Sequence, residues 1–191
     1  MKRLLIAGVL VSSLFIVSCS NNDTAKNETE DPKEAAKELN EDKFDSTNVK
    51  ADADFAVKMA DAGMFEVEMG KLALQNASSP KVKEYAQMMI DEHTKANNEL
   101  MEAARTKNIT LPAGLSDKCQ KKFGELSEKK GKDFDKEYMS AMVDDHEEVL
   151  DVLNKQAENG NDADLKAWAQ SKVGGIKQHL ETAKTTKDMI K

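Results

Sequence analysis

Three histidines and one glutamate stand among apolar residues at helical spacings. The histidines, His93, His146 and His179, fall one each in three different segments of helical periodicity. Residues three and four apart share a helix face, and at these offsets His146 has only apolar neighbours and His93 mainly apolar ones. At least these two rings are therefore predicted to point into a core. Glu66 stands among alanine, glycine and methionine, where a buried carboxylate is costly unless something pairs with it.

The four residues are also predicted to lie at one level of the fold. Glu66 and His93 are nearly equidistant in sequence from the break at Ser78-Ser79-Pro80, and His146 and His179 nearly so from Gly160. One carboxylate and three imidazoles in a helical core suit a single transition-metal ion, namely Zn, Fe, Cu or Mn. Acidic residues close to the histidines in sequence could orient the rings. These candidates are Asp91, Glu92, Asp145, Glu147 and Glu181.

The same residues allow a purely structural interpretation. Buried histidines are often satisfied by a carboxylate across a core, and Glu66 with His93 could be such a pair. Two functions therefore stay open from the sequence. One is a metal-binding or redox and stress-protective protein of the cell envelope. The other is a non-catalytic structural or partner-binding envelope module without metal.

Several chemistries are not expected. Di-iron bundles carry a glutamate three residues before the ligand histidines, and this chain has Ile90, Val143 and Ile176 there. The sequence shows no nucleophile elbow, glycine-rich phosphate loop or zinc-protease motif, so no catalytic residue and no enzyme activity is predicted. A net charge of −7 makes nucleic acid an unfavourable partner.

The elements that must position these residues are predicted to be helices. Apolar residues recur every three or four positions over about residues 53–77, 80–107, 133–159 and 162–190. Aromatic residues make up 5% of the chain, which suits helical cores better than an aromatic-rich sheet. Two short connections and one long one indicate an all-α fold, a ferritin-like antiparallel four-helix bundle. A short extra helix, capped by Ser116, is expected in the connection between the second and third long helices.

The first residues follow the plan of a lipoprotein export signal. Lys2 and Arg3 precede an apolar run at 4–17, which is too short to span a bilayer. The run ends in Ile16-Val17-Ser18-Cys19, which resembles the lipobox cut by the lipoprotein signal peptidase. Residues 1–18 are therefore predicted to be a cleaved signal peptide, with Cys19 as the site of lipid attachment and the membrane as a partner through that lipid.

The predicted lipid anchor places the protein in the bacterial cell envelope. Ser20, rather than an aspartate, follows Cys19, which in many Gram-negative bacteria directs a lipoprotein to the outer membrane, here facing the periplasm. Residues 19–50 are polar and nearly devoid of aliphatic side chains, which predicts a flexible acidic tether. Residues 51–191 then form the folded domain. Lipidation leaves Cys119 without a disulfide partner, and we expect a half-buried structural thiol there.

Several segments resemble the bacterial domain of unknown function numbered 4142 over about residues 51–188. The matching segments are EVEMGKLA at 66–73, VKEYAQMMIDEH at 82–93, Leu111-Pro112, FDKEY at 134–138 with Asp145-His146, and His179-Leu180 with Ala183. The resemblance implies an exported, ferritin-related four-helix domain without a settled activity. It also implies that Glu66, His93, His146 and His179 occupy the family's recurring polar positions. Relatives tend to have Leu-Pro where this chain has Val173-Gly174-Gly175, a change expected to soften the last helix.

Overall fold

The computed structural model describes residues 30–190, and this part of the chain folds into helices. The helices are α1 (Pro32–Lys43), α2 (Thr47–Asn76), α3 (Pro80–Thr106), α4 (Asp117–Ser127), α5 (Gly131–Asn159) and α6 (Ala163–Met189). The predicted all-α fold is confirmed. None of the described helices is long and apolar enough to be a membrane span. The predicted signal peptide and Cys19 lie outside the described residues.

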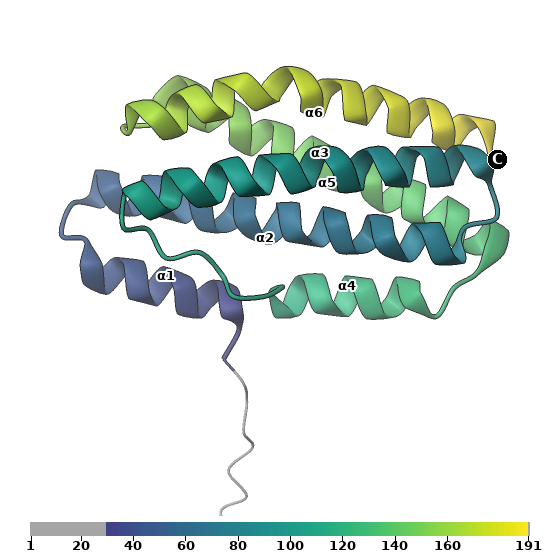
Figure 1. Cartoon of the computed structure of the whole chain (residues 1–191), viewed down its shortest axis with the longest axis horizontal. Helices are drawn as coiled ribbons and strands as arrows, with labels where there is room; N and C mark the ends of the chain where they lie inside the picture. Colours follow the sequence, from purple (N-terminus) through teal and green to yellow (C-terminus); the bar gives the residue numbers. More distant parts are fainter. Residues whose placement is uncertain (1–29, 191) are drawn as a thin grey trace, which may run out of the picture.

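The four long helices α2, α3, α5 and α6 form the predicted antiparallel bundle (Figure 1). The α2–α3 and α5–α6 pairs are hairpins with short connections. The long connection from α3 to α5 carries α4, which lies along the outer side of α2, as the predicted extra helix (Figure 1). Because this connection runs the length of the bundle, α3 and α5 point in the same direction, as in ferritin-like topology.

Buried aspartates tie the connections to the helices. The Asp135 carboxylate on α5 accepts hydrogen bonds from the backbone N–H groups of Ser78 and Ser79, at 3.0 and 2.9 Å, where α3 begins. On α2, Asp61 accepts from the Ser116 N–H at 2.8 Å, and Asp52 accepts from the Asp162 N–H at 2.7 Å. Such bonds satisfy N–H groups that a helix start leaves without partners. They fix the axial position of each helix relative to its neighbours, and therefore the level of the core residues along the bundle.

The predicted tether is wrong from residue 30 onward, because α1 and the start of α2 belong to the folded domain. Asp31 caps α1 by accepting from the Lys33 N–H at 2.8 Å, and Pro32 takes the first helical position, where its missing N–H costs nothing. Ala36 and Asn40 are the buried residues of α1. Its only large aliphatic side chain, Leu39, is 52% exposed. Polar contacts rather than an aliphatic face therefore hold α1, which is why the sequence looked like a tether.

Asn40 makes the most specific of these contacts. Its amide donates to the Thr110 carbonyl at 2.8 Å and accepts from the Thr110 N–H at 2.7 Å. A further ion pair joins Lys33 of α1 to Asp61 of α2 at 3.3 Å. Residues 32–43 are thus fastened both to α2 and to the loop that follows α3.

Within residues 30–190, the core consists of two hydrophobic clusters with a polar layer between them. One cluster contains Met89, Tyr138 and Met142, and the other contains Leu100 and Leu153. On α3, His93 lies in sequence between Met89 of one cluster and Leu100 of the other, and on α5, His146 lies between Met142 and Leu153. The polar layer is therefore flanked on both sides by packed apolar side chains.

Replacing Asn40 by alanine should lower the free energy of unfolding by about 1–3 kcal/mol, because the half-buried backbone groups of Thr110 lose their partner. Urea unfolding followed by circular dichroism measures the change. The matched control is Leu39→Ala, one residue away and exposed, which should change stability by less than about 0.5 kcal/mol. Equal effects of the two substitutions would show that α1 does not pack as described.

Candidate metal centre

The structure brings the three histidines together in the middle of the bundle. His93 lies on α3, His146 on α5 and His179 on α6, and all three are buried, with exposures of 7%, 1% and 3%. The ring centroids are 5.3–5.6 Å apart. One nitrogen from each ring can be chosen so that the three lie within 4.8 Å of one another. Side-chain rotations alone can close such a group around one ion.

Hydrogen bonds fix which nitrogen two of the rings present. His146 Nδ1 lies 2.8 Å from the Met142 carbonyl oxygen, and His179 Nε2 lies 2.8 Å from Glu92 Oε2. Because both oxygens can only accept, these nitrogens carry the protons in the neutral rings. The lone pairs then sit on His146 Nε2 and His179 Nδ1.

These lone-pair nitrogens are buried and have no hydrogen-bond partner among the described protein atoms, and neither has His93 Nε2. Metal-ligating histidines typically donate their other ring N–H to a carbonyl or carboxylate in this way. Three converging imidazole nitrogens fit a mononuclear transition-metal site, with His93, His146 and His179 as the residues that would hold the ion.

Burial keeps the rings of His93 and His146 neutral. Burial, followed by repulsion from the other histidines, lowers the pKa of His93 to about 3. Burial and the nearby His179 lower the pKa of His146 to about 4, although the bond to Met142 opposes this shift. Neutral imidazole is the form that binds metal, so protons do not compete for these two rings near pH 7.

Glu66 lies beside the histidines and differs from the other buried carboxylates. It is 2% exposed, its Oε1 is 3.6 Å from His146 Nδ1, and its Oε2 has no partner among the described residues. Asp52, Asp61 and Asp135 use their oxygens to bind backbone N–H groups. Burial, with Asp145 nearby, raises the pKa of Glu66 well above its usual range. Burial therefore favours the protonated, neutral form of this carboxyl group.

Two of the five predicted orienting residues lie at the centre. Glu92, adjacent to His93 in sequence, instead reaches across to His179 on α6. Asp145 lies beside Glu66 and pairs with Lys122 at 2.7 Å, while burial raises its own pKa.

The prediction of an orienting role is wrong for the other three residues. Asp91 and Glu181 lie two residues from their histidines and Glu147 lies one, and all three are exposed. These offsets turn a side chain about 100–200° around the helix, away from the ring. Asp91 accepts from Gln87 instead, and Glu147 pairs with Lys184 at 2.9 Å.

Two tyrosines of the adjacent hydrophobic cluster border the polar layer and were not predicted as site residues, because their positions fit an apolar core stripe. The hydroxyls of Tyr85 and Tyr138 are buried without partners among the described residues. The Tyr85 ring lies 6.4 Å from the His146 ring, edge to face. Burial, reinforced by Glu66, raises the pKa of both hydroxyls, so both are neutral donors at physiological pH. Tyrosines in an otherwise aliphatic core were the available signal, since a buried hydroxyl normally needs a partner.

The predicted structural role of Cys119 agrees with its surroundings. The thiol is half-buried, and its Sγ lies 3.6 Å from Asp61 Oδ2. Burial raises its pKa to about 11, so it is a poor nucleophile at neutral pH.

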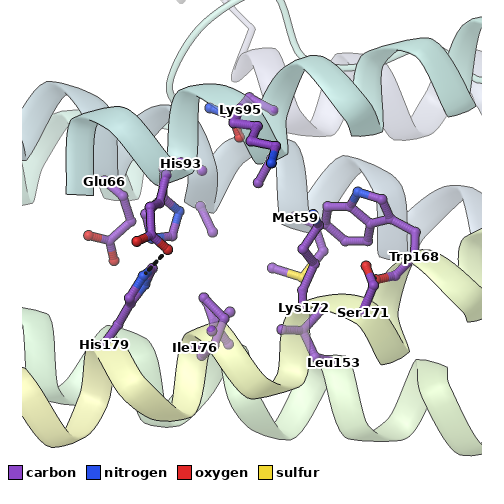
Figure 2. Close-up of a pocket in the computed structure, with 17 residues that line it drawn as sticks. Met59, Glu66, His93, Lys95, Leu153, Trp168, Ser171, Lys172, Ile176 and His179 are labelled. Atoms are coloured by element: carbon purple, nitrogen blue, oxygen red, sulfur yellow. Dashed lines mark hydrogen bonds and ion pairs between the residues drawn. The ribbon is translucent and has the colours of Figure 1, made fainter. Parts of the chain in front are cut away.

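A cavity of about 390 Å³ adjoins the histidines. His93, His179 and Glu66 line one end of it, and Met59 and Trp168 line the other (Figure 2). The cavity gives the centre a space for a ligand that the protein itself does not fill.

Comparison with known proteins adds two findings. The model of a family described as a domain of unknown function (DUF4142) matches residues 23–186, so the match begins before the boundary predicted at residue 51 and includes α1. The solved structure of CopM in the Cu(II)-bound form is similar in fold, with a TM-score of 0.61 and 17% sequence identity. The similarity covers 72% of this chain and 95% of CopM. None of the curated proteins matches the chain significantly.

Acid should destabilise the metal-free protein through His146. The unfolded ring binds a proton below about pH 6.5, whereas the folded ring, with a pKa of about 4, does not. Between these pH values the unfolded state binds more protons, so stability falls as pH falls. Relative to His146→Leu, the wild type should lose roughly 1.5 kcal/mol between pH 6.5 and pH 5. Urea unfolding of both proteins measures this difference, and identical pH dependence would mean that the folded ring titrates normally.

Proposed function

We propose that this chain, which belongs to the DUF4142 family, binds a single transition-metal ion through His93, His146 and His179. The observation that carries the proposal is that three buried imidazole rings converge, and that each ring has one nitrogen without a hydrogen-bond partner among the described residues. A buried polar atom left without a partner costs about 1–3 kcal/mol, and coordination to one ion would compensate all three. A structural role for the histidines would instead call for partners within the core.

The donor set favours copper or zinc over harder metals. Imidazole nitrogen suits Zn, Cu, Fe and Ni, whereas Mn and Mg prefer oxygen ligands, and Cu(II) binds most tightly in the divalent series. The similar fold of CopM has been solved with Cu(II) bound, which supports copper as the first ion to test. Three protein ligands leave a position open, and a metal there supplies a Lewis-acid or redox centre.

The surroundings suit retention of an ion rather than fast exchange with solvent. The histidines lie between two apolar clusters, and Glu92 holds His179 from the surface side with a carboxylate that is 55% exposed. We infer a role in sequestering metal, protecting other envelope components from it. The envelope location itself is proposed from the lipobox at Cys19.

Purified wild-type protein should bind close to one equivalent of Cu(II) or Zn(II) per chain, and His146→Leu should not. Leucine fills a similar volume and removes a buried polar group, so the metal-free variant should be at least as stable as the wild type. Elemental analysis after dialysis gives the stoichiometry. Loss of metal without loss of stability separates a ligand from a structural residue.

Glu92→Ala should weaken metal binding by about 10–100-fold, because His179 loses the carboxylate that orients it. Glu147→Ala is the matched control: it removes an exposed glutamate next to His146 that pairs with Lys184, and should leave affinity unchanged. Competition with a chromophoric chelator measures both. A wild type that binds no metal after reconstitution would overturn the proposed function.

The location has its own test. Cys19→Ala should move the protein from the membrane fraction to the soluble fraction of lysed cells, because the proposed anchor is a lipid on that thiol. Immunoblotting of the fractions measures this, with Cys119→Ala as the control that keeps Cys19. Membrane association unaffected by Cys19→Ala would contradict a lipid anchor.

A further inference from the structure

The cavity beside the histidines has a polar end and an apolar end. His93, His179 and Glu66 line the first, and the second is lined mainly by apolar side chains such as Met59 and Trp168, with Ser171 and Lys172 beside them (Figure 2). At about 390 Å³ the space is at the low end of the range of small-molecule sites. It is large enough for a ligand of roughly ten non-hydrogen atoms, given about 30 Å³ for each water-sized group.

The charges around the cavity favour an anion once a metal is bound. Lys95 and Lys172 line it, as do Glu66 and Glu92. Glu66 Oε2 is buried without a partner among the described residues, and Glu92 hydrogen-bonds to His179. Lys172 pairs with Glu99 outside the cavity. Because the three histidines are neutral ligands, a divalent ion would bring its full charge to the polar end, and that charge decides the preference.

The apolar end can hold an organic body. The Trp168 indole N–H is buried without a partner among the described residues, and Lys172 lies 5.8 Å above its ring. Gly175, inside α6, also lines the cavity, and a Cβ built on it would meet no atom within 4 Å. Glycine costs about 1 kcal/mol relative to alanine within a helix. Its missing side chain leaves the space open beside His179.

We propose that this cavity binds a small organic carboxylate with an apolar body. The carboxylate occupies the open position of the metal held by the three histidines, and the body lies against Trp168 and Met59. The carboxylate contact rests on the proposed metal site, whereas the apolar contacts belong to the cavity alone. The site would then recognise a metabolite-sized acid in addition to holding its metal ion.

Trp168 is the only tryptophan in the chain, so its fluorescence reports on the cavity directly. The experiment titrates Zn(II)-loaded and metal-free protein with 3-phenylpropionate, with its neutral amide 3-phenylpropionamide and with acetate. Zinc is used because its filled d shell does not quench the indole. The loaded protein should bind the carboxylate at least about tenfold more tightly than the amide or acetate, and removal of zinc should abolish the preference for the acid over the amide.

Two glycines give a matched pair of variants. Gly175→Leu fills the cavity and should weaken binding of 3-phenylpropionate by at least about tenfold, while Gly174→Leu should have no effect. Gly174 is exposed and does not line the cavity, yet its Cβ also meets open space, so both leucines improve helix propensity equally. Gly175→Ala adds a single methyl group and should weaken binding of 3-phenylpropionate by an intermediate amount. This variant replaces Gly175→Leu in the comparison if leucine disturbs the neighbouring His179.

The outcomes separate the two proposals, since zinc content is measured first by elemental analysis. A protein that holds zinc but binds acid and amide equally, or binds 3-phenylpropionate equally well in Gly175→Leu, overturns the carboxylate site and leaves the metal site standing. A protein that holds no zinc overturns the proposed function, and with it the metal-linked carboxylate. Tight binding by the wild type and Gly174→Leu, with loss in Gly175→Leu, supports the inference.

Discussion

Three imidazole rings are buried in the middle of this bundle, and the atoms of residues 30–190 leave one nitrogen of each ring without a hydrogen bond. Each such nitrogen costs about 1–3 kcal/mol, a large share of the stability of an ordinary domain. The fold tolerates the cost because tightly packed apolar clusters lie on both sides of the polar layer. A neutral imidazole held in an apolar surrounding, with its other nitrogen already hydrogen-bonded, is prepared to accept a metal.

The geometry of that layer depends on polar contacts far from it. Asp52, Asp61 and Asp135 bind the backbone at the start of α6, α4 and α3, and so set the relative heights of the helices. A shift of one helical turn, about 5.4 Å, would separate the rings beyond the reach of one ion. The aspartates at the helix ends therefore set the positions of the histidines in the middle. Glu66, by contrast, is a buried carboxyl group whose Oε2 has no partner among the described residues.

Helical periodicity was enough to predict the four long helices, and the equal distances of the site residues from the turns were enough to predict their common level. What failed was any inference that depended on contacts across the chain. α1 is held by Asn40 and Asp31 through polar bonds to Thr110 and to the start of α4, so its composition resembled a tether. Sequence proximity likewise misplaced Glu147 and did not show that Glu92 reaches His179. Tyr85 fits a core stripe whether or not its hydroxyl faces a site.

The most direct test of the central claim is anomalous X-ray diffraction from crystals of the metal-loaded protein, collected on both sides of the metal's absorption edge. We predict one strong anomalous peak per chain, within about 2.0–2.1 Å of one nitrogen each of His93, His146 and His179. The ligand atoms should be His146 Nε2 and His179 Nδ1, opposite the nitrogens bonded to Met142 and Glu92. A loaded crystal whose metal lies at surface carboxylates, with no peak between the three rings, would contradict the account.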